Sequence, residues 1–180
     1  MFSPEEFLAG KFLLIDKPLT WTSHDVVNKI RYRLTRYCGV KKIKVGHSGT
    51  LDPLATGLLI IATGGFTKKL DPVIASEKEY TGTFYIGGST ASHDAETPVD
   101  ATFPTSHITE ALIKETAKKF TGKLQQFPPI HSAVKIAGKP LYVNARKGME
   151  IKTEARDIEI YSFEITAIAL PSIHFRVECS

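Results

Sequence analysis

Two segments of the chain alternate apolar and polar residues, and this pattern constrains the fold more than any other feature. In the first segment, 79–86, the residues on one side are Tyr80, Gly82, Phe84 and Ile86. In the second, the residues that alternate with His174, Arg176 and Glu178 are Ile173, Phe175, Val177 and Cys179. A period of two residues is that of a β-strand with one face toward the core. Both segments are therefore predicted to be strands.

Helices and shorter strands are expected elsewhere, without regular β-α-β order. An apolar stripe at helical spacing predicts a helix that Ser23 caps and that ends near Tyr37. A second helix is expected from a cap at Ser106 to about residue 120, with short helices at 67–70 and 141–147. Further strands are expected at 11–16, 58–63, 132–136 and 157–169, and loops at 46–57 and 87–104. The mixture predicts an α+β fold with a mainly antiparallel sheet flanked by helices.

Length and composition indicate an ordinary globular protein. The 180 residues, of which 42% are hydrophobic, suit a single domain over 1–180, and no repeat or linker divides them. The two cysteines and six histidines have neither disulfide-scaffold nor zinc-ligand spacing, and no apolar run could span a bilayer. We expect a monomer in the cytoplasm, without metal and without membrane contact.

Basic residues are concentrated in two segments. The first, 26–51, has seven of them and no acidic residue. They are Lys29, Arg31, Arg33, Arg36, Lys41, Lys42 and Lys44. The second, 131–152, has five basic residues against Glu150 alone. Two such segments on an otherwise acidic chain suggest a polyanion-binding surface, although a solvated helix face with a charged loop explains the charge equally well.

The segment 46–57, which reads GHSGTLDPLATG, contains the strongest candidate for chemistry. Pro53 restricts Asp52 to extended geometry, which holds the carboxylate in a fixed direction. A fixed carboxylate beside His47 and a basic segment could be a nucleophile or a base. On residue chemistry alone, an ordinary Asp-Pro turn with a surface histidine is the better interpretation.

This segment resembles the signature of the bacterial tRNA pseudouridine-55 synthases, the TruB-like family. Four further segments resemble family motifs in the same order. They are LIDKP at 14–18, KEY at 78–80, PPIHSAVK at 128–135 with its continuation to Gly148, and VECS at 177–180. Five ordered motifs from residue 11 to the end make a chance likeness very improbable.

The resemblance implies isomerisation of the T-loop uridine, position 55, of tRNA to pseudouridine, and a pseudouridine synthase fold with an RNA-binding thumb loop. It implies that Asp52 is the catalytic residue, that His47 fills the space left by the flipped base, and that Tyr80 packs on that base. It implies that Lys17 supports the catalytic loop, with direct contact to the substrate as an alternative. The residues expected to contact the T-arm stem-loop through the thumb are Lys135, Tyr142, Arg146 and Lys147. No cofactor is implied, and whether the aspartate attacks the sugar, attacks the base or removes a ribose proton is left open.

The end of the chain departs from the family pattern. In the family, a Cys-Ser pair like Cys179-Ser180 precedes a Lys-Gly-Thr-Tyr-Ile-Arg type segment, whose arginine pairs with the catalytic aspartate. That segment and the small C-terminal RNA-binding domain are missing from these 180 residues. We therefore expect the catalytic domain to be incomplete at its C-terminus and the turnover of this chain to be impaired.

Three alternatives are compatible with the sequence. The first is a non-catalytic module that binds or folds tRNA. The second is a relative that modifies another RNA or works with a guide RNA. The sequence DPLATG at 52–57, which has the bacterial form, argues against this alternative. The third is an unrelated hydrolase that uses Asp52. This alternative has little support, because the sequence has no second carboxylate and no Ser-His pair at useful spacing.

Overall fold

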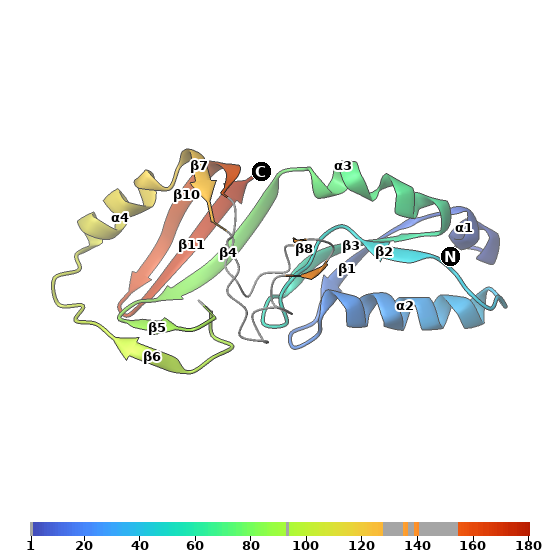
Figure 1. Ribbon diagram of the computed structural model, residues 1–180, viewed down its shortest axis with the longest axis horizontal. Coiled ribbons are helices and arrows are strands. Elements are labelled where there is room, and N and C mark those ends of the chain that lie inside the picture. Colours follow the sequence, from blue (N-terminus) through green and yellow to red (C-terminus); the bar gives the residue numbers. More distant parts are fainter. Residues whose placement is uncertain (1, 93, 128–134, 137–138, 141–154) are drawn as a thin grey trace. The chain divides into compact units, whose positions relative to one another are not determined.

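The computed structural model describes residues 2–92, 94–127, 135–136, 139–140 and 155–180 (Figure 1). The chain divides into two compact units, Met1–Ser76 and Glu77–Ser180. Each unit has its own antiparallel sheet and its own helices.

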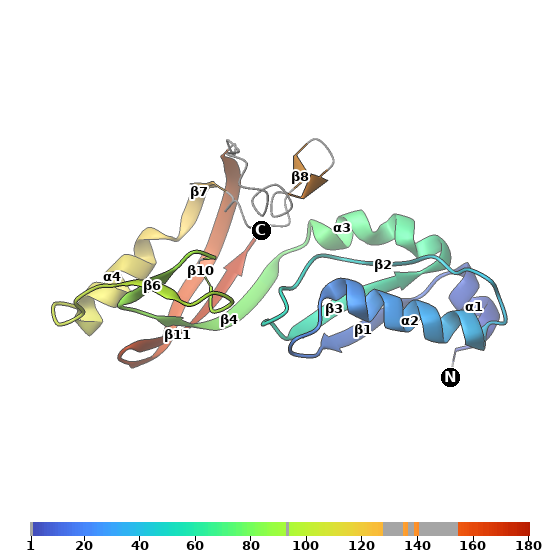
Figure 2. The same cartoon turned by 60° about the horizontal axis from the view of Figure 1, so that its bottom comes forward.

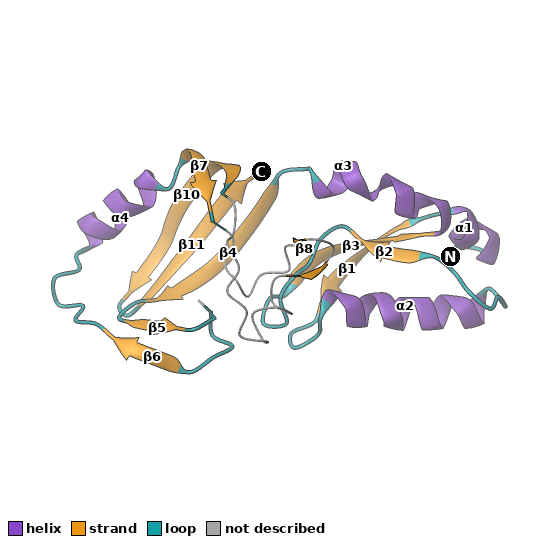
Figure 3. Cartoon of the chain, in the orientation of Figure 1, coloured by secondary structure: helices purple, strands orange, loops and turns teal. Residues whose placement is uncertain are grey.

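The first unit is a three-stranded antiparallel sheet with helices around it (Figure 3). Its strands are β1 (Phe12–Lys17), β2 (Val45–His47) and β3 (Gly57–Thr63), in the order β1-β3-β2. Its helices are α1 (Pro4–Ala9), α2 (Ser23–Tyr37), the 3-10 helix η1 (Gly64–Lys69) and α3 (Leu70–Ile74). The predicted strand at 58–63 is thus confirmed as the central strand β3, and the strand at 11–16 is confirmed as β1.

Helix α2 packs its apolar stripe on one face of this sheet. Val26, Val27 and Leu34 are buried, and they form a core cluster with residues of the sheet and of the segment before it. These partners are Ile43, Val45, Leu59 and Ile61. The predicted helix is confirmed, and it ends at Tyr37 as expected.

The prediction that Ser23 caps α2 is wrong, because Thr22 is the cap. The Thr22 hydroxyl accepts from the Asp25 N–H at 3.0 Å, and the Asp25 carboxylate accepts from the Thr22 N–H at 2.9 Å. These bonds form a capping box. The hydrogen bonds from the Thr22 hydroxyl and backbone lower the pKa of the Asp25 carboxyl. Because Thr22 supplies the cap, the Ser23 hydroxyl is available for another partner.

The second unit is built on a four-stranded antiparallel sheet in the order β4-β11-β10-β7 (Figure 2). These strands are β4 (Lys78–Tyr85), β7 (Gly122–Gln126), β10 (Arg156–Ala169) and β11 (Ser172–Cys179). Helix α4 (Glu110–Lys119) contacts β10. Two further pairs are β5 (Gly88–Thr90) with β6 (Val99–Thr102), and β8 (Lys135–Ile136) with β9 (Lys139–Pro140). The strands predicted at 79–86, 157–169 and 173–179 are confirmed.

The alternating segments place their residues on two chemically different faces. On the face toward α4, the Phe84 and Phe175 rings stack with centroids 4.3 Å apart. On the opposite face, Arg176 pairs with Glu79 at 2.7 Å. The register, which aligns Phe175 with Gly82 and Arg176 with Thr81, produces this separation.

Other expectations from the sequence, in both units, are corrected. The predicted loop 87–104 contains the paired strands β5 and β6. The second helix begins after a cap at Thr109 rather than Ser106, because the Thr109 hydroxyl accepts from the Leu112 N–H. Strand β7 and helix α1 were not expected, and β2 reaches into the predicted loop 46–57. The expected helix 141–147 and residues 132–134 lie outside the described residues.

Gly82 makes room for the aromatic stack, which gives a prediction about stability. A Cβ atom at Gly82 would lie 2.6 Å from Cζ of Phe175. We expect Gly82→Ala to lower the free energy of unfolding by about 1–3 kcal/mol, because the Phe175 ring must shift within its packing. Thermal unfolding of this variant is compared with that of Thr81→Ala, on the opposite face, for which a change of about 0.5 kcal/mol or less is expected. Equal stability of Gly82→Ala and the unsubstituted chain would contradict this packing account.

Within the described part of the chain, no helix combines the length and the apolar composition that crossing a membrane requires.

Candidate active site

The side chain of Lys17 joins the turn after β1 to the loop that carries Asp52. Lys17 is 0% exposed. Its Nζ donates to the carbonyl oxygens of Pro18 at 3.1 Å, Trp21 at 2.5 Å and Pro53 at 3.4 Å. A buried ammonium group requires such partners, since leaving it unpaired is very costly. Its burial favours support of the loop over direct contact between Lys17 and RNA.

The loop between β2 and β3 presents Asp52 from a backbone that is held on both sides. On one side, the Leu51 N–H donates to the Ser23 hydroxyl at 2.9 Å. On the other, the Pro53 carbonyl accepts from the Thr20 N–H at 2.8 Å. The loop closes on itself where the Ala55 N–H donates to the Asp52 carbonyl at 3.0 Å. The backbone on both sides of Asp52 is therefore held by Ser23, the first residue of α2, and by Thr20 in the turn before that helix.

The Asp52 side chain is exposed, and its carboxylate has no hydrogen bond or ion pair with any residue that the structure describes. Its neighbours in the loop are held through their backbone atoms, so the carboxylate itself is not occupied by structural contacts. A carboxylate placed in this way can act as a base or a nucleophile toward a bound substrate.

His47 lies at the end of β2, where the loop begins. Its Nδ1 is 2.6 Å from the Gly49 carbonyl oxygen, a contact that requires a proton on Nδ1. The Gly49 N–H lies 3.3 Å from the same nitrogen, but a donating nitrogen cannot accept there, so the shorter contact defines the tautomer. In the neutral ring, Nε2 then remains an acceptor.

A basic groove of about 640 Å³ runs beside His47 in the first unit. Its cationic lining residues are Arg31, Lys42 and Lys44, and Thr67 adds a hydroxyl. Arg31 is half-buried, and its Nη2 donates to the Val45 carbonyl at 3.2 Å. The groove places positive charge next to the candidate loop, where an anionic ligand would be attracted.

The other predicted residues belong to the second unit. Tyr80 lies in β4, aligned with Val177 of β11, and is 43% exposed on the face that also bears Phe84. Lys135 is in β8, where its backbone pairs with that of Pro140. Tyr142, Arg146 and Lys147 lie outside the described residues. The structure thus places Lys17, His47 and Asp52 in the first unit, at the end of β1, at the end of β2 and in the loop after β2, and it describes Tyr80 in the second unit.

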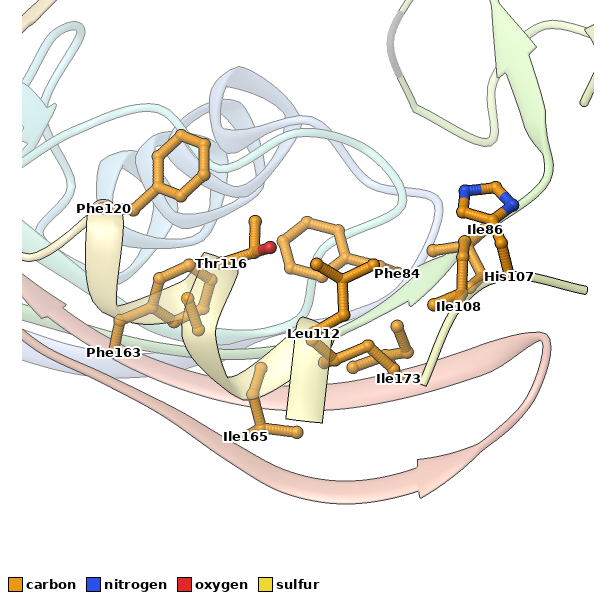
Figure 4. Close-up of a pocket in the computed structure, with 12 residues that line it drawn as sticks. Phe84, Ile86, His107, Ile108, Leu112, Thr116, Phe120, Phe163, Ile165 and Ile173 are labelled. Carbon is orange, nitrogen blue, oxygen red and sulfur yellow. The ribbon is translucent and has the colours of Figure 1, made fainter. Parts of the chain in front are cut away.

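The second unit also contains an apolar cavity of about 490 Å³ between α4 and the sheet (Figure 4). Residues of α4 such as Leu112 face Phe163 and Ile173 across it. Among the described residues that line it, only His107 and Thr116 have polar side chains, and none is a predicted site residue. The described lining contains no carboxylate.

Among the described residues, no group of three or more His, Cys, Asp or Glu side chains could hold a metal ion.

Comparisons with known proteins place this arrangement in context. The family model of the TruB family pseudouridylate synthases (N-terminal domain) matches residues 35–180. The chain is 58% identical to the tRNA pseudouridine synthase B of Flavobacterium johnsoniae over 179 residues, which cover 99% of this chain and 78% of that protein. It is 50% identical to the tRNA pseudouridine synthase B of Parabacteroides distasonis, with 97% of this chain and 74% of that protein covered.

Solved structures give the same picture of the fold. A chain in the crystal structure of a Cbf5-Nop10-Gar1 complex superposes with a TM-score of 0.65 at 26% identity. The match covers 99% of this chain and 44% of that chain. Together with the mixed helices and antiparallel sheets, this likeness confirms the predicted α+β fold of the pseudouridine synthases.

Proposed function

This chain belongs to the TruB family of pseudouridylate synthases, and we propose that it converts the T-loop uridine of tRNA, at position 55, to pseudouridine. The observation that carries the proposal is the 58% identity, over 99% of this chain, with a protein named tRNA pseudouridine synthase B. The family match runs from residue 35 to 180, across both units, which supports a single catalytic domain made of the two.

The proposed reaction is a balanced isomerisation. The bond between C1′ of the ribose and N1 of uracil breaks, and a bond between C1′ and C5 forms. The proton lost from C5 is balanced by the proton gained at N1, so no oxidant or reductant is needed. Asp52 supplies the reacting carboxylate, as nucleophile or base, from a loop that Ser23, Thr20 and Lys17 hold.

The target base has to leave its loop before the carboxylate can reach the glycosidic bond. Extruding a base costs a few kcal/mol of lost stacking. In this proposal His47 fills the space that the base leaves, and Tyr80 stacks on the extruded base. Stacking on an aromatic ring is worth about 1–3 kcal/mol per base, enough to offset much of that cost.

Contacts to the RNA backbone are assigned to two basic segments. In this proposal Lys135, Tyr142, Arg146 and Lys147 contact the RNA backbone, and Arg31, Lys42 and Lys44, which line the groove beside His47, offer further cations. Such contacts position an RNA without reading its sequence. They also make affinity depend on salt, because binding releases the counterions of the phosphates.

The thumb assignment predicts a change in the salt dependence of tRNA binding. Reversing the charges with Lys135→Glu and Arg146→Glu should weaken binding and reduce the slope of log K against log salt by about 0.9 for each phosphate that is no longer neutralised. The measurement is a filter-binding titration across a series of salt concentrations, and the control is the exposed pair Lys118→Glu and Lys123→Glu, which changes the net charge equally. If both double variants show the same slope, the thumb is only a solvated loop.

Tritium release tests the proposed function itself. Because C5 loses its hydrogen when it bonds to C1′, tRNA labelled with [5-³H]uridine should release one tritium to water per pseudouridine formed. We expect release from tRNA in the presence of the protein as its gene encodes it. Binding of tRNA without any release would instead identify a non-catalytic RNA-binding module.

A further inference from the structure

Ser23 makes a two-point contact with the residue that precedes Asp52. Its hydroxyl accepts from the Leu51 N–H at 2.9 Å and donates to the Leu51 carbonyl at 3.2 Å. One small side chain thereby satisfies both polar groups of a single residue, across 28 positions of sequence. The contact fixes the orientation of the backbone from which Asp52 projects.

The Ser23 hydroxyl is itself held rigidly. The residue is 2% exposed and lies in the first turn of α2, next to Val26 and Val27 of the core cluster. The capping of α2 is done by Thr22 and Asp25, so it does not compete for the Ser23 hydroxyl. A buried hydroxyl that the helix cap does not use is a firm attachment point for a loop.

Both neighbours of Asp52 are therefore attached to the stretch that runs from the end of β1 to the first residue of α2. Leu51 is attached through the Ser23 side chain, and Pro53 through the Thr20 N–H and the Lys17 ammonium group. The carboxylate between them has no partner among the described residues. The backbone of this loop is thus fixed by hydrogen bonds, while the Asp52 carboxylate makes none with the described residues.

We propose that Ser23 is a positioning residue for Asp52, acting through the backbone of Leu51 to hold the carboxylate in its reactive direction. The inference rests on the proposed function and adds a residue to its machinery. Displacing a reacting group by about 1 Å can cost a factor of about 10² in rate, so removing the Ser23 hydroxyl should lower the rate and spare RNA binding.

The test compares Ser23→Ala with Thr22→Ala, which removes a neighbouring hydroxyl from the cap of the same helix. Both variants should lose thermal stability. At saturating tRNA, Ser23→Ala should lower the single-turnover rate about 10- to 100-fold, and Thr22→Ala should leave it within about twofold. The Kd for tRNA should be unchanged in both. Ser23→Cys keeps a similar shape, but its thiol is a weak donor and acceptor, so its single-turnover rate should lie between those of Ser23→Ala and the unsubstituted protein. This variant replaces Ser23→Ala in the test if Ser23→Ala does not fold.

Hydrogen exchange gives a readout that does not depend on activity. The Leu51 amide should lose protection in Ser23→Ala and in Ser23→Cys, and keep it in Thr22→Ala. Rates of Ser23→Ala and Ser23→Cys within twofold of the unsubstituted protein would overturn the inference, as would equal losses in Ser23→Ala and Thr22→Ala. A failure of the proposed function looks different, because the unsubstituted protein would then form no pseudouridine.

Discussion

Asp52→Asn should abolish pseudouridine formation while leaving the affinity for tRNA unchanged. The substitution keeps the size of the side chain but removes the charge and the basicity that the reaction requires. The contacts that hold the loop use the backbone atoms of Leu51 and Pro53 and not the Asp52 side chain, so the variant should fold normally. Removing the single reacting group of an enzyme costs a factor of about 10³ or more.

Single-turnover tritium release and filter binding measure the two halves of this prediction. The matched control is Asp71→Asn, an exposed carboxylate of α3 in the same unit, for which no change in rate is expected. A rate for Asp52→Asn within about tenfold of the unsubstituted protein would remove Asp52 from its assigned role. A loss of tRNA affinity without a loss of rate would make Asp52 a binding residue.

Lys17→Met should damage both stability and activity. The thioether side chain resembles lysine in length, but it removes the ammonium donor from the carbonyls of Pro18, Trp21 and Pro53. Among the described residues, the Pro53 carbonyl then keeps only the Thr20 N–H, and the Pro18 carbonyl keeps only the Trp21 N–H. Hydrogen bonds to a charged group contribute about 1.5–3 kcal/mol each, and the 3.4 Å contact to Pro53 is the weakest of the three. We expect a loss of about 3 kcal/mol or more in the free energy of unfolding, and about 10²-fold in rate because the Asp52 loop loosens.

Denaturant unfolding measures the stability loss, and single-turnover rates are taken where the variant remains folded. Lys17→Arg should not restore the stability or the rate, because a planar guanidinium does not fit a site built for a compact ammonium. Lys41→Met provides the control for an exposed lysine, with an expected change of about 0.5 kcal/mol or less. Near-normal stability of Lys17→Met would show that these contacts contribute little.

Much of the fold followed from periodicity, because the strongest patterns belong to elements with one buried face. The stripe of α2 and the alternation in β4 and β11 are of this kind. Strand β7 was missed because it is an edge strand with a polar sequence, including Lys123 and Gln125, and only its pairing with β10 defines it. The pair β5–β6 is too short to show a period.

In the candidate site, too, some features could be predicted from the sequence and others could not. The loop around Asp52 could be found because its sequence is distinctive. The Ser23 contact to Leu51 could not be found, since it joins positions 28 residues apart and Ser23 reads in sequence as a helix cap. The burial of Lys17 likewise depends on the packing of β1 against the loop. The roles of Tyr80 and of the thumb residues stay predictions.

The most direct test of the central claim is to map pseudouridine in tRNA at single-nucleotide resolution. The substrates are a T-arm stem-loop and the same RNA with the position-55 uridine replaced by cytidine, each incubated with the protein as its gene encodes it. We predict pseudouridine at position 55 of the first RNA and none in the second. Pseudouridine at another position, or none in tRNA but some in ribosomal RNA, would contradict the account.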